Sequence, residues 1–385
     1  MITYFTSESV FRGHPDKVCD QIADAILDEA LWQDKDSKMA VECTIKDDLV
    51  IIYGEATTKA KLDYKDIALT VLSEIGYDED YTVLIKVGEQ SPEINHAVAP
   101  NEEDLRAGDQ GIVFGYACNE TKDYMPLSIS LAHHLAYYIG EDLRDLVSQL
   151  NPDGKTQVTV KYLGDKIVGI ETVLVSFCHT PIAQDKFEKL KANVKDVAEL
   201  CLQKDPDVKQ GWLDNTKYII NPAGMWTVGG SFGDSGTTGR KIVVDTYGGH
   251  GRIGGGALSS KDSSKVDRSG AYYARYVAKH IVASGLADSC EIQVSYGIGL
   301  AKPLSINVKT TGAKVDDRTI VWLINKHFNF SVGNIIRELD LKRPIYRSTA
   351  CYGHFGGEEY PWEELTKLCD LQKSIELLES SNFDL

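Results

Sequence analysis

The segment Gly13-His14-Pro15-Asp16-Lys17 combines an expected helix start with residues that could bind phosphate and a metal ion. Pro15 suits the first turn of a helix, where free N–H groups and the helix dipole favour an anion. Lys17 adds positive charge and His14 a hydrogen-bond donor. Asp16 repels phosphate unless a cation lies between them, so the pairing indicates a Mg²⁺ bridge. The alternative is an ordinary helix start with an acidic first turn.

A second segment, from Gly229 to Arg268, is rich in glycine and basic residues within an otherwise acidic chain. Its glycines let the backbone approach phosphate groups closely. Its candidate phosphate ligands are Arg240, Lys241, Lys261 and Lys265, and its candidate metal or ammonium ligands are Asp234 and Asp267. A flexible loop with solvated charges is the alternative. Together the two segments predict a site for a polyphosphate nucleotide with Mg²⁺.

Glu42 and Glu55 lie on two expected strands, 40–45 and 49–57, which have the pattern of a hairpin. If the turn is centred on Asp47-Asp48, Glu42 faces Tyr53, and Glu55 lies one diagonal step away on the same face. Two carboxylates on one face repel each other unless a cation lies between them. A monovalent ion or a substrate ammonium group suits that place, and a solvent-facing pair of glutamates is the alternative.

The composition limits the class of protein. A length of 385 residues suggests two or three domains, and 43% hydrophobic residues is ordinary for a globular protein. The formal net charge of −16 argues against a nucleic-acid partner, because a duplex needs a basic face. None of the eight cysteines has Cys-x-x-Cys spacing, no signal-peptide pattern is visible, and no apolar run reaches the roughly 20 residues that span a bilayer. We therefore expect a cytoplasmic protein with free thiols and no membrane partner.

Hydrophobic periodicity predicts the elements that must position these residues. The expected helices are 15–31, 62–75, 128–146, 182–202, 268–284 and 317–327. The expected strands are 40–45, 49–57, 81–87, 157–163, 166–179, 242–247, 291–301 and 304–310. The order strand–strand–helix recurs at intervals of about 100 residues, which indicates three α+β units, the third beginning near Tyr218. Residues 89–110 lack periodicity and are expected to form a loop.

Two common nucleotide-binding motifs do not explain this pattern. Gly249-x-Gly251-x-x-Gly254 matches the dinucleotide-binding fingerprint, but no apolar-periodic helix follows it directly, so we attribute the match to chance. The chain has no Gly-x₄-Gly-Lys-Ser/Thr loop, which excludes a P-loop enzyme, and no His-Glu-x-x-His pair of a zinc protease.

Several long and irregular segments match a known family over nearly the whole chain, to about Trp362. They are Phe5–Val10, Gly13–Lys17, Gly88–Pro92, Ala107–Gly111, Phe114–Tyr116, Gly239–Gly249, Gly254–Ala257, Ser264–Arg268 and Tyr352–Gly356. On these segments the chain closely resembles the S-adenosylmethionine synthetases, also called methionine adenosyltransferases.

The resemblance implies a reaction in which methionine sulfur attacks C5′ of ATP and expels tripolyphosphate, which the enzyme then hydrolyses to pyrophosphate and phosphate. A thioether is a neutral nucleophile with no proton to lose, so no Ser-His or Cys-His base is required. The reaction needs alignment of the substrates and neutralisation of a highly charged leaving group. The basic residues, His14 and Mg²⁺ fit that demand.

The resemblance also implies roles for individual residues. The catalytic set is His14, Lys155, Arg240, Lys261 and Lys265. The ATP-binding set is His14, Asp153, Lys155, Trp226, Asp234, Arg240, Lys241, Ala257 and Lys261, with Trp226 stacking on adenine. The methionine-binding set is Glu55, Gln90, Asp234 and Lys265. Asp16 and Asp267 are implied to bind Mg²⁺, with two ions per site, and Glu42 to bind K⁺.

In this family the fold is three similar α+β domains, each a small β-sheet with helices on one face, in a pseudo-threefold arrangement. The corresponding domains here are 1–98, 111–228 and 229–385, and residues 90–110 match a mobile active-site loop. The resemblance places the site between two subunits of a homodimer or homotetramer.

The sequence departs from the family pattern at a few positions. Arg106 and Ser260 stand where glycine is usual, Ser231 and Ser263 where proline is common, and Met225 where many members have arginine. No departure removes a charged catalytic position, so we expect an active enzyme. The rivals are a tripolyphosphatase or other nucleotide phosphohydrolase, and a regulatory subunit without catalysis. The implied methionine pocket argues against the first, and the intact phosphate ligands argue against the second.

Overall fold

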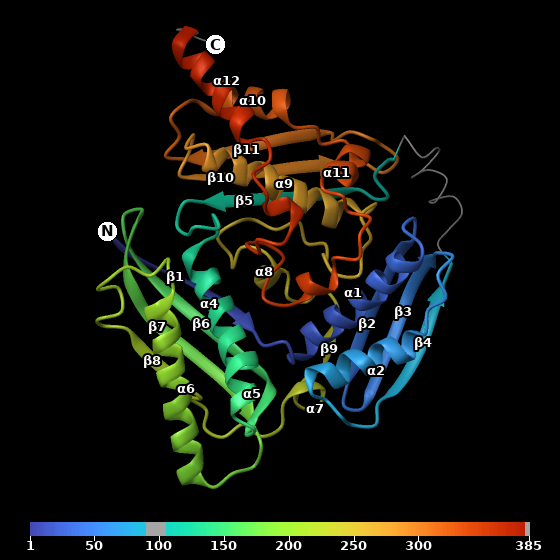
Figure 1. Ribbon diagram of the computed structural model, residues 1–385, viewed down its shortest axis with the longest axis vertical. Helices are drawn as coiled ribbons and strands as arrows, with labels where there is room; N and C mark the ends of the chain where they lie inside the picture. The colour runs from blue at the N-terminus through green and yellow to red at the C-terminus, as the bar shows by residue number, and fades with distance from the viewer. Residues whose placement is uncertain (90–104, 382–385) are drawn as a thin grey trace.

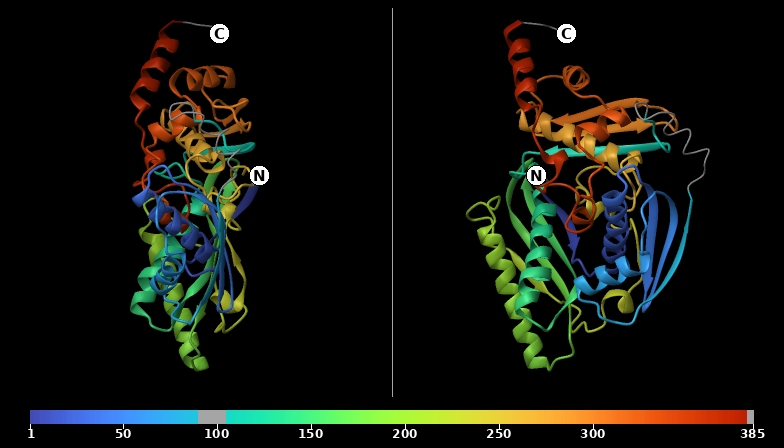
Figure 2. Two further views of the ribbon diagram at one scale, coloured as in Figure 1. Left: turned by 90° about the vertical axis from the view of Figure 1, so that its right-hand side faces the viewer. Right: turned by 45° about the vertical axis from the view of Figure 1, so that its right-hand side comes forward.

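The computed structural model describes residues 1–89 and 105–381 and contains three units, each a small sheet with helices (Figure 1). The expected α+β class with three units is therefore confirmed. Seen from the side, the molecule is flattened, with the sheets toward one face and the longer helices toward the other (Figure 2). No helix in the described ranges has both the length and the apolar character needed to cross a bilayer.

The first unit is a sheet covered by two helices. Its strands, in the order β4-β3-β2-β9, are β2 (Lys38–Lys46), β3 (Leu49–Thr57), β4 (Thr82–Gly88) and β9 (Gly236–Thr237), and its helices are α1 (Pro15–Gln33) and α2 (Tyr64–Ile75). Helix α1 begins where the His14 side chain accepts the Asp16 N–H, and it buries the expected apolar residues at spacing four from Val18 to Ala30. Helix α2 ends at Gly76, whose φ of +100° suits glycine.

The other two units have the same build. The second sheet, in the order β1-β6-β7-β8, consists of β1 (Ile2–Val10), β6 (Leu150–Leu163), β7 (Lys166–His179) and β8 (Lys217–Ile220), with helices α4 (Leu127–Tyr137), η1 (Tyr138–Leu143, a π-helix), α5 (Arg144–Leu146) and α6 (Gln184–Lys204). The third, in the order β11-β10-β5, consists of β5 (Gly111–Cys118), β10 (Ser289–Tyr296) and β11 (Ser305–Thr311), with helices α9 (Val266–Ala283), α10 (Asp317–His327), α11 (Val332–Glu338) and α12 (Leu368–Ser381). Short helices in connecting segments are α7 (Gly230–Gly233), α8 (Ile242–Asp245), η2 (Arg347–Ala350) and η3 (Pro361–Glu363).

The sheets are built from strands that lie far apart in sequence. Strand β1 pairs antiparallel with β6, from Ile2 opposite Leu163 to Val10 opposite Lys155. Strand β5 pairs with β10, and β9 with β2. Strands β1 and β5 have no counterpart among the expected elements. The expected start of the third unit near Tyr218 is wrong, because β8 pairs with β7 in the second sheet. The domain boundaries given above stay predictions.

Residues 242–247 are a second correction, because this expected strand is the short helix α8. A short apolar run fits either a strand or a buried helical turn, and periodicity alone does not separate them. The Asp245 N–H donates to the Lys241 carbonyl at 2.8 Å, which closes a helical turn.

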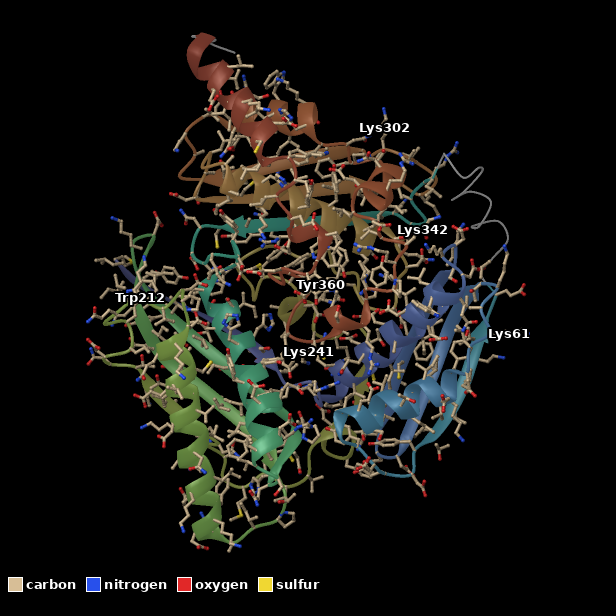
Figure 3. The ribbon with its side chains drawn as sticks, viewed as in Figure 1. Lys61, Trp212, Lys241, Lys302, Lys342 and Tyr360 are labelled. Atoms are coloured by element: carbon tan, nitrogen blue, oxygen red, sulfur yellow. The ribbon has the colours of Figure 1, made fainter. Side chains whose placement is uncertain are left out.

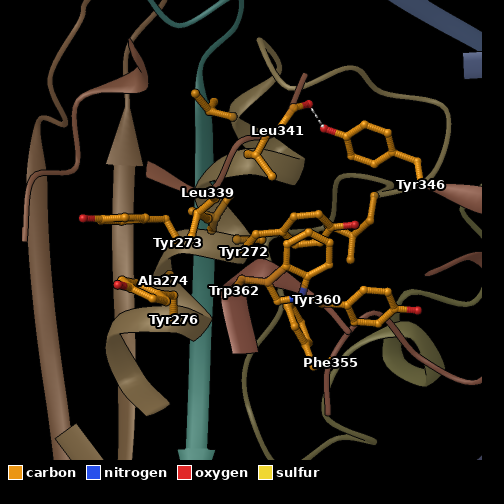
Figure 4. Close-up of a cluster of buried hydrophobic side chains, with 14 of the residues drawn as sticks. Tyr272, Tyr273, Ala274, Tyr276, Leu339, Leu341, Tyr346, Phe355, Tyr360 and Trp362 are labelled. Atoms are coloured by element: carbon orange, nitrogen blue, oxygen red, sulfur yellow. Dashed lines mark hydrogen bonds between the residues drawn. The ribbon is translucent and has the colours of Figure 1, made fainter. Parts of the chain in front are cut away.

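The third unit is packed around aromatic rings (Figure 4) and a buried ion pair. Tyr272 stacks on Trp362 with ring centroids 3.8 Å apart, and Tyr360 stacks on the same indole at 5.0 Å. Arg275 binds both carboxylate oxygens of Glu363 at 3.0 and 2.9 Å, and both side chains are almost fully buried. Loss of one partner would leave a buried charge, so the pair fixes the C-terminal segment against α9.

Candidate active site

The start of α1 lies against the start of β6. The Gly13 N–H donates to the Pro152 carbonyl at 3.2 Å, and a Cβ on Gly13 would lie 2.3 Å from Cβ of Pro152. Only glycine permits that approach. The contact brings His14 next to the strand that carries Asp153 and Lys155, so the structure unites predicted site residues from two units.

Asp16 is the point where the helix start meets the glycine-rich segment. Its Oδ2 lies 2.6 Å from Nζ of Lys241, and its Oδ1 lies 3.6 Å from Nε of Arg240. Oδ1 also accepts the Thr237 N–H at 3.0 Å. The Asp16 side chain is 2% exposed, whereas that of Arg240 is 50% exposed. Two predicted phosphate ligands and a predicted metal ligand therefore meet at Asp16, and Lys241 is labelled near the middle of the view in Figure 3.

His14 is a buried, uncharged imidazole. Its Nδ1 accepts the Asp16 N–H at 3.2 Å, which places the ring proton on Nε2. Burial, together with the positive charges of Lys241 and Lys155 and against the opposing charge of Asp234, lowers the pKa of His14 to about 3. The ring can therefore donate a hydrogen bond from Nε2 without carrying a charge.

Asp153 holds the glycine-rich segment against β6. Its Oδ2 accepts the Gly230 N–H at 2.8 Å, while its buried Oδ1 has no partner among the described residues. Burial raises the pKa of Asp153 to about 6. An unpaired buried acceptor suits a ligand hydroxyl.

Two further predicted site residues flank Gly230 in sequence. Trp226 is half-buried and donates from Nε1 to the Val228 carbonyl at 2.7 Å, and Asp234 is exposed.

A second set of charged residues lies on the segment that leads into α9. Nζ of Lys261 lies 2.6 Å from Oδ2 of Asp267, and Nζ of Lys265 lies 2.6 Å from Oδ2 of Asp262. All four side chains are no more than 23% exposed. Asp262 has no predicted role, and its spacing of three residues from Lys265 is the signal that could have identified it.

The hairpin of β2 and β3 confirms the expected relation of the two glutamates. Glu42 lies opposite Tyr53, and Glu55 lies opposite Ala40. Burial and the neighbouring Glu42 both raise the pKa of Tyr53. Ala40 also bridges to Lys261, so Ala40 of β2 lies between the exposed Glu55 and Lys261 of the second charged set.

The predicted site residues therefore form two groups. The helix-start group is His14, Asp16, Asp153, Lys155, Asp234, Arg240 and Lys241; the Lys261 group is Glu55, Lys261, Lys265 and Asp267. Within residues 1–89 and 105–381, no hydrogen bond or ion pair joins a charged side chain of one group to one of the other. The backbones meet at Gly239, where a Cβ would lie 2.3 Å from Cβ of Ala257. Gln90 lies outside the described residues.

Two sequence features do not belong to the site. The prediction that Lys17 charges the anion site is wrong, because this lysine is 1% exposed and binds Asp20 and Asp245. Residues 229–233 match the Gly-x-Ser-x-Gly pattern of serine hydrolases. Ser231 is buried, however, and its hydroxyl donates to the Asp47 carbonyl at 2.7 Å.

The donor set limits how a metal could bind. The described part of the chain contains no cluster of three or more His, Cys, Asp or Glu side chains able to hold an ion. Mg²⁺ commonly uses one or two carboxylates together with substrate phosphates. Asp16 and Asp267 each offer one carboxylate beside a lysine, which fits a Mg²⁺ ion whose remaining ligands are phosphate oxygens and water.

The fold and this arrangement of charge define an α+β protein of three units with a candidate polyanion site. Models of the N-terminal, central and C-terminal domains of S-adenosylmethionine synthetase match residues 2–94, 104–226 and 228–364. S-adenosylmethionine synthases of Clostridium tetani and Brachyspira hyodysenteriae are each 48% identical to the chain, over 96% of it and 99% and 97% of their own lengths. That of Thermosynechococcus vestitus is 47% identical, over 96% of this chain and 97% of its own. The chain belongs to the S-adenosylmethionine synthetase family, as the resemblance indicated.

Proposed function

We propose that this chain is a methionine adenosyltransferase. It forms S-adenosylmethionine from ATP and L-methionine, and it then hydrolyses tripolyphosphate to pyrophosphate and phosphate. Family membership supports the activity. The observation that carries it is the convergence of Lys155, Arg240 and Lys241 on His14 and Asp16 at the start of α1.

In the proposed reaction, the sulfur lone pair of methionine forms a bond to C5′ while the C5′–oxygen bond breaks. The bonding electrons leave with tripolyphosphate, and the product is a sulfonium cation, so no proton moves in this step. Lys155, Arg240 and Lys241 neutralise the departing charge, and Nε2–H of His14 donates to an oxygen of ATP near the ribose. Bound Mg²⁺ supplies further neutralisation of the phosphates at Asp16 and Asp267.

Substrate orientation is assigned to the remaining predicted residues. Lys261 and Lys265 bind the phosphate chain, with Lys265 near methionine. Glu55, Asp234 and Gln90 contact methionine, and Trp226 stacks on adenine. Ala257 and Asp153 complete the ATP site. We assign K⁺ to Glu42, whose face of the hairpin also carries Glu55.

The site is proposed to be completed between two copies of the chain, in a homodimer or homotetramer. The two charged groups are not joined through their side chains, which supports a site assembled from one group of each subunit. Large apolar side chains flank both groups at exposures of 42 to 60%; they are Ile112, Met225, Val228, Phe232 and Val243. Exposed apolar residues concentrated around a site are typical of an interface.

All eight cysteines are free, which supports a cytoplasmic location.

The deciding experiment is incubation of the purified protein with ATP, L-methionine, Mg²⁺ and K⁺, followed by chromatographic detection of S-adenosylmethionine. We expect that product together with pyrophosphate and phosphate. Phosphate release without S-adenosylmethionine would instead identify a tripolyphosphatase or phosphohydrolase. ATP binding with neither product would identify a regulatory subunit.

A further inference from the structure

Four aspartates recur at every fourth position of α1 and so form one stripe along the helix. They are Asp16, Asp20, Asp24 and Asp28. Each accepts backbone N–H groups from a segment that is distant in sequence: Thr237 at 3.0 Å, Gly239 at 2.8 Å, Ser260 at 2.9 Å, and Tyr346 and Arg347 at 3.0 and 2.8 Å, respectively. The stripe therefore fastens successive loops of the C-terminal half to one helix.

Asp20 binds the residue directly before the Arg240–Lys241 pair. Its Oδ1 accepts the Gly239 N–H at 2.8 Å, its Oδ2 accepts from Nζ of Lys17 at 2.9 Å, and its exposure is 0%. Gly239 has a φ of +77°, so the chain turns there in the left-handed conformation. A fixed acceptor at this turn sets the direction in which the next two residues leave it.

Asp24, one turn later, binds the residue directly before Lys261. Its Oδ1 accepts the Ser260 N–H at 2.9 Å, and the guanidinium of Arg268 binds its two oxygens at 2.7 and 2.8 Å. Ser260 has a φ of +78°, a conformation that is unfavourable for a residue with a Cβ. The buried bond to Asp24 helps to hold Ser260 there. In both loops, therefore, a buried carboxylate of α1 accepts the N–H of a residue in the left-handed conformation.

We propose that Asp20 and Asp24 are positioning residues for the transferase site. Each fixes one backbone N–H of a left-handed residue whose successor is a proposed phosphate ligand. The identity of that ligand rests on the proposed function, but the fastening of the loops does not. Because the two acceptors stand one turn apart on one helix, about 6 Å along its axis, α1 sets the spacing of the Arg240–Lys241 and Lys261 loops within a subunit.

The test is calorimetric binding of inorganic tripolyphosphate, with Mg²⁺, to the full chain and to Asp20→Asn. A single Asn carbonyl cannot easily satisfy both the Gly239 N–H and Lys17, so the fastening weakens. Folding should survive because Lys17 keeps Asp245 as its partner. We expect tripolyphosphate affinity to fall about tenfold or more, with kcat falling as well, while circular dichroism stays unchanged. Asp24→Asn should show the same loss of tripolyphosphate affinity. Because this variant also weakens the buried pair with Arg268, its binding is measured below its lowered unfolding temperature.

Two matched controls separate positioning from general loosening of α1. Asp28→Asn changes the same helix and the same kind of N–H acceptor, but its loop carries no proposed ligand, so its tripolyphosphate affinity should stay within about twofold of wild type. On the loop side, Gly239→Ala places a Cβ 2.3 Å from Ala257 and should reproduce the Asp20→Asn loss. Gly164→Ala, also at positive φ but with nothing within 4 Å, should not.

Folded Asp20→Asn and Gly239→Ala proteins with wild-type tripolyphosphate affinity would overturn the proposal. An equal loss in Asp28→Asn would overturn it as well, because the effect would then not follow the ligand-bearing loops. If wild type binds tripolyphosphate but forms no S-adenosylmethionine, the proposed function fails, and the binding measurements still decide the role of the two aspartates.

Discussion

Lys241 and Asp16 form an ion pair, with Nζ 2.6 Å from Oδ2, across 225 positions of sequence. A proposed phosphate ligand and a proposed Mg²⁺ ligand are therefore in direct contact. When a metal-bound polyphosphate binds, the lysine can turn to phosphate and the carboxylate to the metal. The contact links the two binding events at one point.

Asp16→Asn should weaken metal use more than it weakens the fold. The amide keeps an acceptor for the Thr237 N–H but loses the charge that attracts Mg²⁺. We expect kcat to fall by about 10² or more and the half-saturating Mg²⁺ concentration to rise, as measured by S-adenosylmethionine formation across a Mg²⁺ titration. Glu171→Gln, which breaks the exposed pair with Lys161, is the control and should leave both quantities unchanged. An unaltered Mg²⁺ dependence in Asp16→Asn would refute the assignment.

Lysines at the site and in the core should respond differently to truncation. Lys261→Ala and Lys265→Ala should each lower kcat by about 10² or more with a small change in unfolding midpoint, because both side chains reach solvent at 18 and 14% exposure. Lys17→Ala should instead lower the midpoint strongly, since Asp20 and Asp245 would lose their buried cation. Steady-state kinetics and thermal denaturation check the contrast. Wild-type rates in both site variants would remove Lys261 and Lys265 from the phosphate site.

His133 should make stability fall with acid. It is 6% exposed, its Nδ1 lies 2.8 Å from the Ser9 hydroxyl, and burial lowers its pKa to about 3. The unfolded chain takes up the proton near pH 6.5 and the folded chain does not, so stability present above pH 6.5 is lost as pH falls toward 3. Between pH 6.5 and 5, wild type should therefore lose about 2 kcal/mol more unfolding free energy than His133→Gln. Denaturant titrations at the two pH values test this, and parallel losses would contradict it.

Local patterns account for the elements that were predicted correctly. The helix 317–327 and the hairpin register of Glu42 opposite Tyr53 follow from periodicity and a short turn. The pairing of β1 with β6 does not, because Val10 and its partner Lys155 lie far apart in sequence. The prediction of a strand at 242–247 failed for a similar reason, since Asp245 is bound to the distant Lys17, a contact that the local sequence does not reveal.

The charged residues of the site were visible in sequence, but their environments were not. Lys17 stands in the helix-start segment and Lys241 in the glycine-rich segment of an acidic chain. Only folding shows that Lys17 is enclosed by Asp20 and Asp245, whereas Lys241 reaches the surface beside Asp16. The spacing of Asp20 and Asp24 was equally visible. The sequence does not show, however, which backbone N–H groups these carboxylates bind.

Arg106 offers a test of the departure from the glycine that is usual at this position in the family. The next residue, Ala107, is fully buried and exchanges backbone hydrogen bonds of 2.9 Å with Leu300 and Gly299. Arg106→Gly removes a long side chain and adds backbone freedom directly before this anchor. We expect a changed rate of product release, measured by presteady-state and steady-state kinetics. Identical rates would show that the arginine at this position has no kinetic effect.

Mixed dimers test whether the helix-start group and the Lys261 group of different subunits meet in one site. Lys241→Ala and Lys261→Ala homodimers should both be nearly inactive, because every site lacks one ligand. In a heterodimer of the two, sites shared between subunits would be of two kinds. One of the two sites would carry both substitutions, and the other would carry neither. Purification with two affinity tags should therefore recover about half of the wild-type activity per dimer. A site contained within one subunit would leave the heterodimer as inactive as its parents, because each chain would carry its own defect.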